Sequence, residues 1–406
     1  MQYKNHLAIL LRLVAPVCSL LLLSAALPLK AAPYTPTDSD EVLANWGEAV
    51  DRINTPLKIP EVNTANTTLA LTRAAEQLAG AGKPGQSYRY QLAERSLTSL
   101  ANQLPDNRAQ RQQYRLLHAN VLQHSHRFKE ALQELDTLFD QAPNHVAGRL
   151  MAARINLVMG QPQLAREHCL ALLGQTDLLT AAGCSLEARS YIDSEQGGSL
   201  QDSYRELSAL IQREGLPNDE RGPWLAQVLA DMATRLDHPA QAAEWLSNFN
   251  PRISTNYLAQ WADTQLTLGN NAEVLQTLAP VVDATGVVDD ALLLRLAIAE
   301  KAMTPASAAA KETRSDQPQS LQGATNATAL RWQSLMQARV ALREERGDRE
   351  HAAQMARYYL DLQPNAARAL HWATLNTLSS REYTDNELLR RAEKLAGGAS
   401  IYQSEG

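Results

Sequence analysis

The sequence predicts an all-α protein in which antiparallel helix pairs stack into a superhelical solenoid. Three observations support this fold class. Only 5% of the 406 residues are aromatic, and Phe occurs three times, which is too few for an ordinary β-sandwich or barrel. Apolar residues recur at helical spacing between short polar turns. Small and apolar positions also recur with a period of about 34 residues, which indicates a repeated unit. A generic helical bundle is the alternative.

The N-terminal stretch 1–31 predicts an export signal. Lys4 and Arg12 form a basic start, the stretch 13–29 is apolar, and small residues follow. We expect cleavage after Ala26 or Ala31, and therefore a periplasmic or secreted protein. An uncleaved N-terminal anchor is the competing interpretation, because an apolar stretch of about 17 residues is at the short limit for a membrane-spanning helix.

The charge of the chain argues against nucleic-acid and membrane partners. Cleavage after Ala31 removes three cations and no acid, so the formal charge goes from −6 to −9. Binding to phosphates needs clustered Lys and Arg, and the sequence has no basic stripe. We expect no nucleic-acid partner, and no membrane contact beyond the N-terminal signal or anchor.

The clearest repeat unit spans residues 112–144. The apolar positions of its first helix are Tyr114, Leu117, Val121 and Leu122. A turn at 124–127 follows, and the apolar face of the second helix consists of Phe128, Ala131, Leu132, Leu135 and Leu138. Pro143 ends this helix, because proline cannot continue it.

The next stretch repeats this layout. A first helix ends near Gly160, and the second is expected to turn Leu164, Ala165, Cys169 and Leu172 inward. Ala165 follows Ala131 by one period of about 34 residues, and Cys169 follows Leu135 by the same interval. A small residue recurs because two helices cross closely at that position.

Residues 112–144 resemble a tetratricopeptide (TPR) repeat, with the family's positions occupied by Ala119, Phe128, Ala131 and Pro143. Residues 333–365 match about as well, at Val340, Gly347, Ala352, Tyr359 and Pro364. The match is looser between these units, and it covers roughly residues 85–396. The chain is also similar to exported, uncharacterised bacterial repeat proteins, a resemblance that implies no mechanism.

The sequence predicts five regions. They are a signal peptide at 1–31, a partly ordered N-terminal segment at 32–65, a TPR-like solenoid at 66–303, a low-complexity mobile loop at 304–328, and C-terminal TPR-like repeats at 329–400. The loop is polar and has almost no large apolar residue, which is typical of mobile segments. It is either a clasp across the solenoid or an insertion tolerated at a helix–helix turn.

The sequence predicts no metal, no cofactor and no catalytic residues. His118, His124 and His126 lie close together in the chain, but no Cys or acid stands beside them at ligand spacing. No sequence pattern of a catalytic nucleophile or of a phosphate-binding loop is present. We therefore expect a protein that is not an enzyme.

Cys169 and Cys184 would remain after cleavage of the signal. An oxidising compartment allows a disulfide between them, and antiparallel neighbouring helices could bring them within reach. The alternative is two small buried apolar side chains, because free Cys behaves in that way.

The resemblance to TPR repeats implies that the first helices line a concave face. The positions facing it would be Gln113, Leu116, Asn120, Leu150, Arg154, Asn256 and Asp263. Their mixed character suits a protein segment better than a small metabolite. We therefore predict an exported, non-enzymatic scaffold that binds another protein. The alternatives are a membrane-tethered arm of an envelope complex, or a metal-binding carrier or enzyme that uses an unrecognised pocket.

Overall fold

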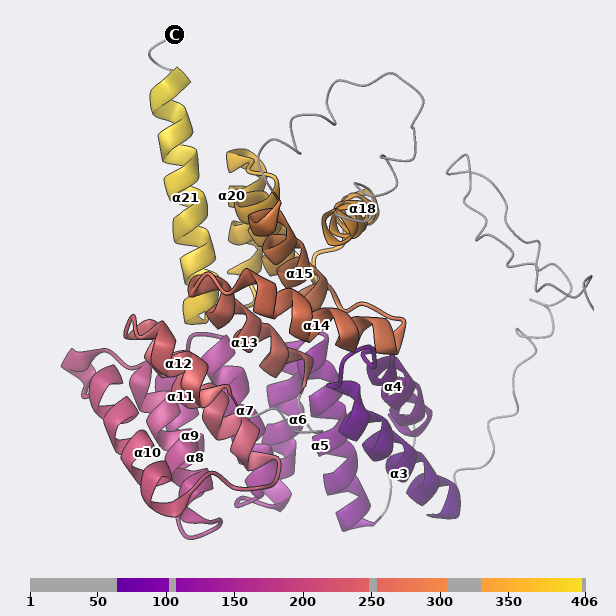
Figure 1. The fold of residues 1–406 in the computed structure, drawn as a ribbon. Helices are drawn as coiled ribbons and strands as arrows, with labels where there is room; N and C mark the ends of the chain where they lie inside the picture. Colours follow the sequence, from indigo (N-terminus) through magenta and orange to yellow (C-terminus); the bar gives the residue numbers. More distant parts are fainter. Residues whose placement is uncertain (1–63, 102–106, 248–253, 305–329, 404–406) are drawn as a thin grey trace, which may run out of the picture. The chain divides into compact units, whose positions relative to one another are not determined.

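The computed structural model describes residues 64–101, 107–247, 254–304 and 330–403, which all belong to one compact unit, Val62–Gly406. Within these ranges the chain forms helices joined by turns and contains no strand (Figure 1). The all-α prediction is therefore confirmed for the described part of the chain. The predicted signal peptide, the N-terminal segment and the loop at 304–328 lie outside the described residues, apart from Thr64, Ala65 and Thr304 at their edges.

The helices carry the labels of Figure 1. In chain order they are α3 (Thr64–Ala81), α4 (Tyr88–Ala101), α5 (Arg108–His124), α6 (Phe128–Gln141), α7 (Val146–Val158), α8 (Pro162–Leu170), α9 (Leu178–Ser190), η1 (Ser194–Gln196), α10 (Leu200–Glu214), α11 (Arg221–Arg235), α12 (Pro239–Trp245), α13 (Thr255–Thr267), α14 (Asn271–Thr285), α15 (Asp290–Met303), α18 (Arg331–Arg346), α19 (Ala352–Arg357), η3 (Tyr358–Leu362), α20 (Ala366–Asn376) and α21 (Tyr383–Gln403).

Local sequence explains many of the helix ends. Asn107 precedes α5, and its side chain accepts hydrogen bonds from the backbone N–H groups of Ala109 and Gln110, which would otherwise lack partners. Pro162 begins α8, where its missing N–H costs nothing. Gly347 ends α18 with φ +63°, a left-handed conformation that glycine adopts without strain. The residues at these positions therefore determine where the helices begin and end.

Consecutive helices pack as pairs. α3 packs on α4, α5 on α6, α7 on α8, α9 on α10, and α11 on α12. The first helix of each pair from α5 to α13 also contacts the first helix of the next, up to α15. Each pair therefore buries part of its apolar surface against its neighbours, as expected for a helical repeat.

The buried positions predicted for the first two units are largely confirmed. Ala131, Leu135 and Leu138 are fully buried in one cluster, and Ala165 and Cys169 are fully buried in the next. The prediction for Leu164 is wrong, because this side chain is 45% exposed. Ala165 and Cys169 mark the buried stripe of α8, and the preceding residue lies about 100° around the helix from it.

The pairing of helices changes after α15. α18 packs mainly against α15, whereas α19 packs against α20. The two helices of the predicted repeat at 333–365 therefore have different principal partners. A buried carboxylate fixes the α15–α18 contact: Glu300 accepts hydrogen bonds from the backbone N–H groups of Trp332 (3.2 Å) and Gln333 (2.8 Å) in the first turn of α18.

Candidate functional site

The residues predicted for the concave face lie on three first helices, α5, α7 and α13. Gln113 and Asn256 are exposed, and Leu116, Asn120 and Leu150 are half-buried. Leu116 packs against the core cluster of α5, α6 and α7, and Leu150 packs against that of α7, α8 and α9. These two leucines therefore contribute to packing between neighbouring pairs as well as to the surface.

Arg154 of α7 lies between two carboxylates. Its Nη2 atom is 2.7 Å from Oε1 of Glu382, which immediately precedes α21, and its Nη1 atom is 3.6 Å from Oε1 of Glu187 on α9. The side chain of Arg154 remains 44% exposed. One residue of the predicted concave face therefore already holds a residue from the C-terminal part of the chain.

Helix α11 extends this group of charges. The hydroxyl of Tyr191 donates a hydrogen bond to Asp231 (2.9 Å), and Nε of Arg235 donates to the same carboxylate (2.8 Å). The guanidinium of Arg235 lies over the ring of Tyr191, 3.8 Å from its centre. We call Arg154, Glu187, Tyr191, Asp231, Arg235 and Glu382 the Arg154 cluster. It joins α7, α9 and α11 to the residue before α21.

The Arg154 cluster contains three carboxylates and two guanidinium groups, so its carboxylates are only partly neutralised. Burial raises the pKa of Glu187 to about 7; Arg154 opposes this effect, and Asp231 adds to it. Burial also raises the pKa of Glu382, again against the effect of Arg154. The cluster therefore changes its protonation near neutral pH.

We expect Glu187→Gln to stabilise the protein at pH 8 relative to wild type, and to lose this advantage as the pH falls to 4.5. The pKa of Glu187 rises from 4.5 to about 7 on folding. Between these values the unfolded chain releases a proton that the folded chain keeps. The stability of the wild type therefore falls as the pH rises, by up to about 3 kcal/mol. Urea unfolding followed by circular dichroism at several pH values measures this difference.

The matched control is Glu206→Gln on α10, where the side chain is 46% exposed and pairs with Arg189. The stability curve of this control should run parallel to that of wild type. Identical pH dependence of Glu187→Gln and wild type would contradict the interpretation of the Arg154 cluster.

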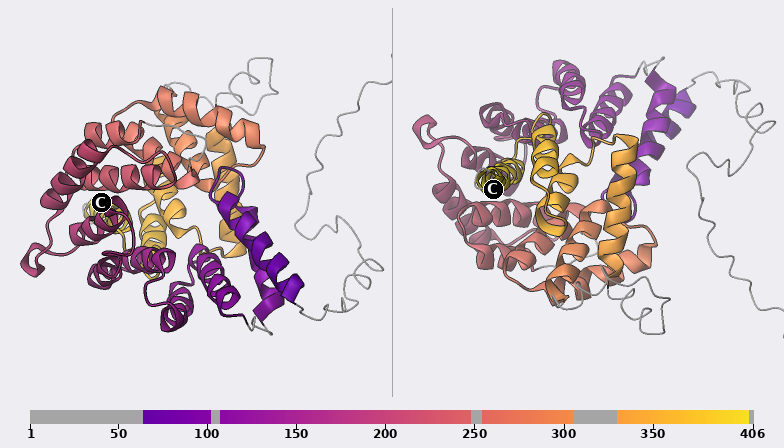
Figure 2. Two further views of the ribbon diagram at one scale, coloured as in Figure 1. Left: turned by 90° about the horizontal axis from the view of Figure 1, so that it is seen from below. Right: turned by 90° about the horizontal axis from the view of Figure 1, so that it is seen from above.

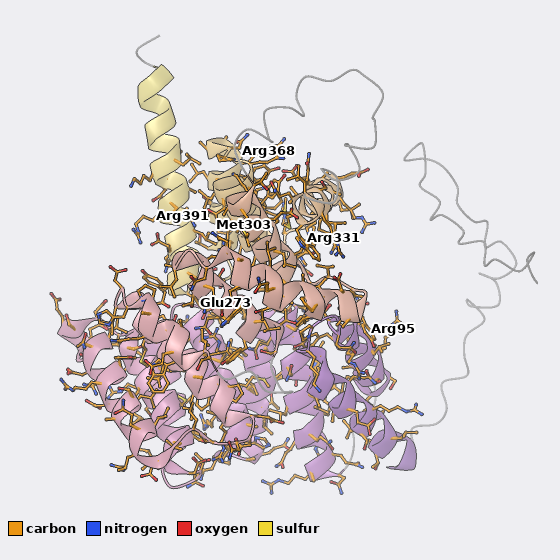
Figure 3. The ribbon with its side chains drawn as sticks, in the orientation of Figure 1. Arg95, Glu273, Met303, Arg331, Arg368 and Arg391 are labelled. Atoms are coloured by element: carbon orange, nitrogen blue, oxygen red, sulfur yellow. A yellow bond between two sulfur atoms is a disulfide. The ribbon has the colours of Figure 1, made fainter. Side chains whose placement is uncertain are left out.

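Asp263 of α13 is the second charged residue predicted for the concave face. It accepts hydrogen bonds from Arg295 of α15 (2.5 Å) and from Arg357 of α19. Burial disfavours its ionisation, but the two arginines outweigh burial and hold the pKa of Asp263 below its usual value. Arg357 also pairs with Asp361 (3.1 Å), and Arg391 of α21, labelled in Figure 3, pairs with the same carboxylate.

The two charged residues of the predicted concave face therefore contact the C-terminal part of the chain, Arg154 at the loop before α21 and Asp263 at α19. Figure 2 shows these helices in yellow beside helices from earlier in the chain. Helical periodicity could not identify Glu187, Glu382 or Arg357 as partners, because it reports which face of a helix is buried and not which distant segment covers it.

A cavity of about 340 Å³ lies where the turn between α5 and α6 meets the end of α7 and the loop between α20 and α21. Its lining residues are His126, Arg127, Phe128, Lys129, Glu130, Met159, Leu378 and Ser379. Arg127 pairs with Glu130 across the first turn of α6. The lining therefore combines apolar, basic, acidic and hydroxyl side chains.

The structure contains a disulfide between Cys169 and Cys184, whose Cα atoms are 5.4 Å apart. Both side chains are buried in the cluster formed by α7, α8 and α9. The bond joins the second helix of one pair to the first helix of the next, which is the connection that the sequence left open.

The three histidines have different neighbours. Nδ1 of His118 is 3.1 Å from Oε1 of Glu134, the ring of His124 stacks on Tyr90, and His126 meets Phe128 edge to face. Among the described residues, no group of three or more His, Cys, Asp or Glu side chains is placed to hold a metal ion. Glu134 is the neighbour that spacing along the sequence did not reveal.

No helix among residues 64–101, 107–247, 254–304 and 330–403 combines the length and the apolar character needed to cross a membrane.

A scan of the sequence against models of known protein families finds no match. A search among curated proteins finds no significant match either.

Proposed function

We propose that this protein is an exported, non-enzymatic scaffold that binds another protein through the concave face of a TPR-like solenoid. The paired helices and the successive contacts between first helices support this proposal, because stacked pairs present such a face. The observation that carries it is Arg154, which is 44% exposed on a first helix and binds a carboxylate from a separate segment of chain.

The character of the face favours a protein segment as its ligand. Gln113 is exposed, Asn120 is half-buried, and Leu116 and Leu150 keep part of their apolar surface at the solvent boundary. A peptide offers backbone amides, apolar side chains and charges over the length of several helices, and can satisfy all of these groups.

Affinity capture with the tagged full-length protein tests this proposal. We expect the exported fraction of cells to yield a protein that wild type retains and that Arg154→Ala retains at least fivefold less, on the order of 1 kcal/mol of binding free energy. Arg205→Ala is the matched control, because Arg205 on α10 is 68% exposed and pairs only with nearby Asp202 among the ion pairs described.

Circular dichroism must show that both variants are folded, with the helix content of wild type, under the conditions of the capture. Retention of the same proteins by Arg154→Ala, Arg205→Ala and wild type would contradict the proposal.

A further inference from the structure

The loop between α20 and α21, Thr377–Glu382, is held by hydrogen bonds to Asp385. Asp385 in the first turn of α21 is buried, and its carboxylate accepts three hydrogen bonds. The donors are the side-chain amide of Asn376 (2.7 Å), the hydroxyl of Ser380 (2.5 Å) and the backbone N–H of Glu382 (3.1 Å). Asp385 therefore ties the loop to the two helices that it connects.

This loop docks on the end of α7. The backbone N–H of Arg381 donates a hydrogen bond to the carbonyl oxygen of Val158 (2.7 Å). Val158 is the last residue of α7, where carbonyl groups lack partners within the helix. Glu382 adds its ion pair with Arg154 one turn earlier on the same helix. The loop thus provides a hydrogen-bond donor for the carbonyl group of Val158 and a carboxylate for Arg154.

Gly160 permits this close approach. Its φ is +72°, and a Cβ atom at this position would lie 3.2 Å from Cβ of Arg381. A larger residue would be strained by the backbone conformation and would also press against the loop. The turn after α7 is therefore shaped to receive another backbone.

The docked loop does not fill the cavity at the end of α7. Leu378 lies at the edge of the 340 Å³ cavity, yet its side chain is 73% exposed. Lys129 lines the cavity, Arg127 there pairs with Glu130, and Arg154 on α7 binds Glu382 of the loop. The loop thus presents an apolar side chain, Leu378, and a carboxylate four residues later, Glu382. Glu382 forms an ion pair with Arg154, whereas Leu378 stays mostly exposed.

We propose that Thr377–Glu382 is an internal ligand at the end of α7, and that the partner is a protein segment with the same two features, an apolar residue and a carboxylate four residues later, which displaces the loop. This inference rests on the proposed function, since it names the ligand class of the same face. The apolar residue of the segment takes the place of Leu378 beside His126, Phe128 and Met159, and its carboxylate takes over the ion pair with Arg154.

A fluorescently labelled synthetic peptide of residues 376–386 is the probe. Its affinity for full-length wild type should be weak, because the loop of the same chain competes with it. The full-length variant Glu382→Lys places a cation next to Arg154 and opens the face, so it should bind the peptide about tenfold more tightly, in proportion to the open fraction. Glu393→Lys, an exposed position later on α21, is the matched control and should bind as weakly as wild type.

A charge exchange tests the contact itself. Arg154→Glu should lose affinity for the wild-type peptide and gain affinity for a peptide with Lys in place of the residue at 382. Equal binding of both peptides to Arg154→Glu, or equal affinity of Glu382→Lys and Glu393→Lys, would overturn the inference. If no variant binds the peptide while Arg154→Ala still loses its captured partner, the internal-ligand inference fails and the proposed function stands.

Discussion

Replacement of Asp290 by Ala is expected to lower the free energy of unfolding by about 3 kcal/mol, because it leaves two arginines without their shared carboxylate. Asp290 begins α15, and its side chain is only 4% exposed. It pairs with Arg339 (2.7 Å) and Arg343 (2.5 Å), both on α18, and Arg343 has a second, more exposed partner in Asp348. The loss should therefore weaken the α15–α18 pair, and urea unfolding followed by circular dichroism measures it.

Asp283→Ala provides the matched control. Asp283 on α14 also pairs with an arginine of α18, Arg331, which is labelled in Figure 3, but both side chains are about half exposed. Ion pairs at the surface contribute at most about 1 kcal/mol, so this variant should stay close to wild type. Equal destabilisation by the two substitutions would contradict the role assigned to Asp290.

Removal of the disulfide is expected to have an effect of similar size. The double variant Cys169→Ala with Cys184→Ala should be less stable by about 3 kcal/mol, because closing a loop of about 15 residues restricts the unfolded chain to that extent. The two positions are 15 residues apart in the sequence. Ala keeps both positions apolar within their buried cluster, so the lost bond should dominate the change.

Wild type unfolded in the presence of a strong reductant provides the comparison. The urea midpoint of reduced wild type should shift toward that of the double Ala variant, whereas reductant should leave the midpoint of the variant unchanged. A double variant that unfolds at the wild-type midpoint would show that the bond contributes little to the folded chain.

The sequence predicted the local structure well because that structure depends on short-range signals. The helices α5, α6 and α7 follow the apolar spacing and the turn residues around them, such as Pro143. Ala131 and Ala165 are buried where the period of the repeat placed them. These features need only helical geometry and the conformational preferences of single residues.

Long-range pairing was not accessible in the same way. The apolar face of α18 includes Trp332, Met336 and Val340, and this pattern would suit a contact with α19 as well as the observed contact with α15. Arg154 and Asp263 each have one partner far along the chain, Glu382 and Arg357 respectively. A carboxylate in the sequence does not identify the arginine that it will meet, because tertiary packing decides that contact.

Because Glu382 lies far along the chain, Arg154 is synthesised well before the carboxylate that covers it. Arg154 precedes Glu382 by roughly 230 residues, and synthesis proceeds from the N-terminus at about 5–20 residues per second. The end of α7 is therefore made roughly 10–45 seconds before the carboxylate that covers its arginine. Any ligand of Arg154 that is present during synthesis would meet an uncovered arginine in this interval, whereas one that arrives later would meet the completed chain.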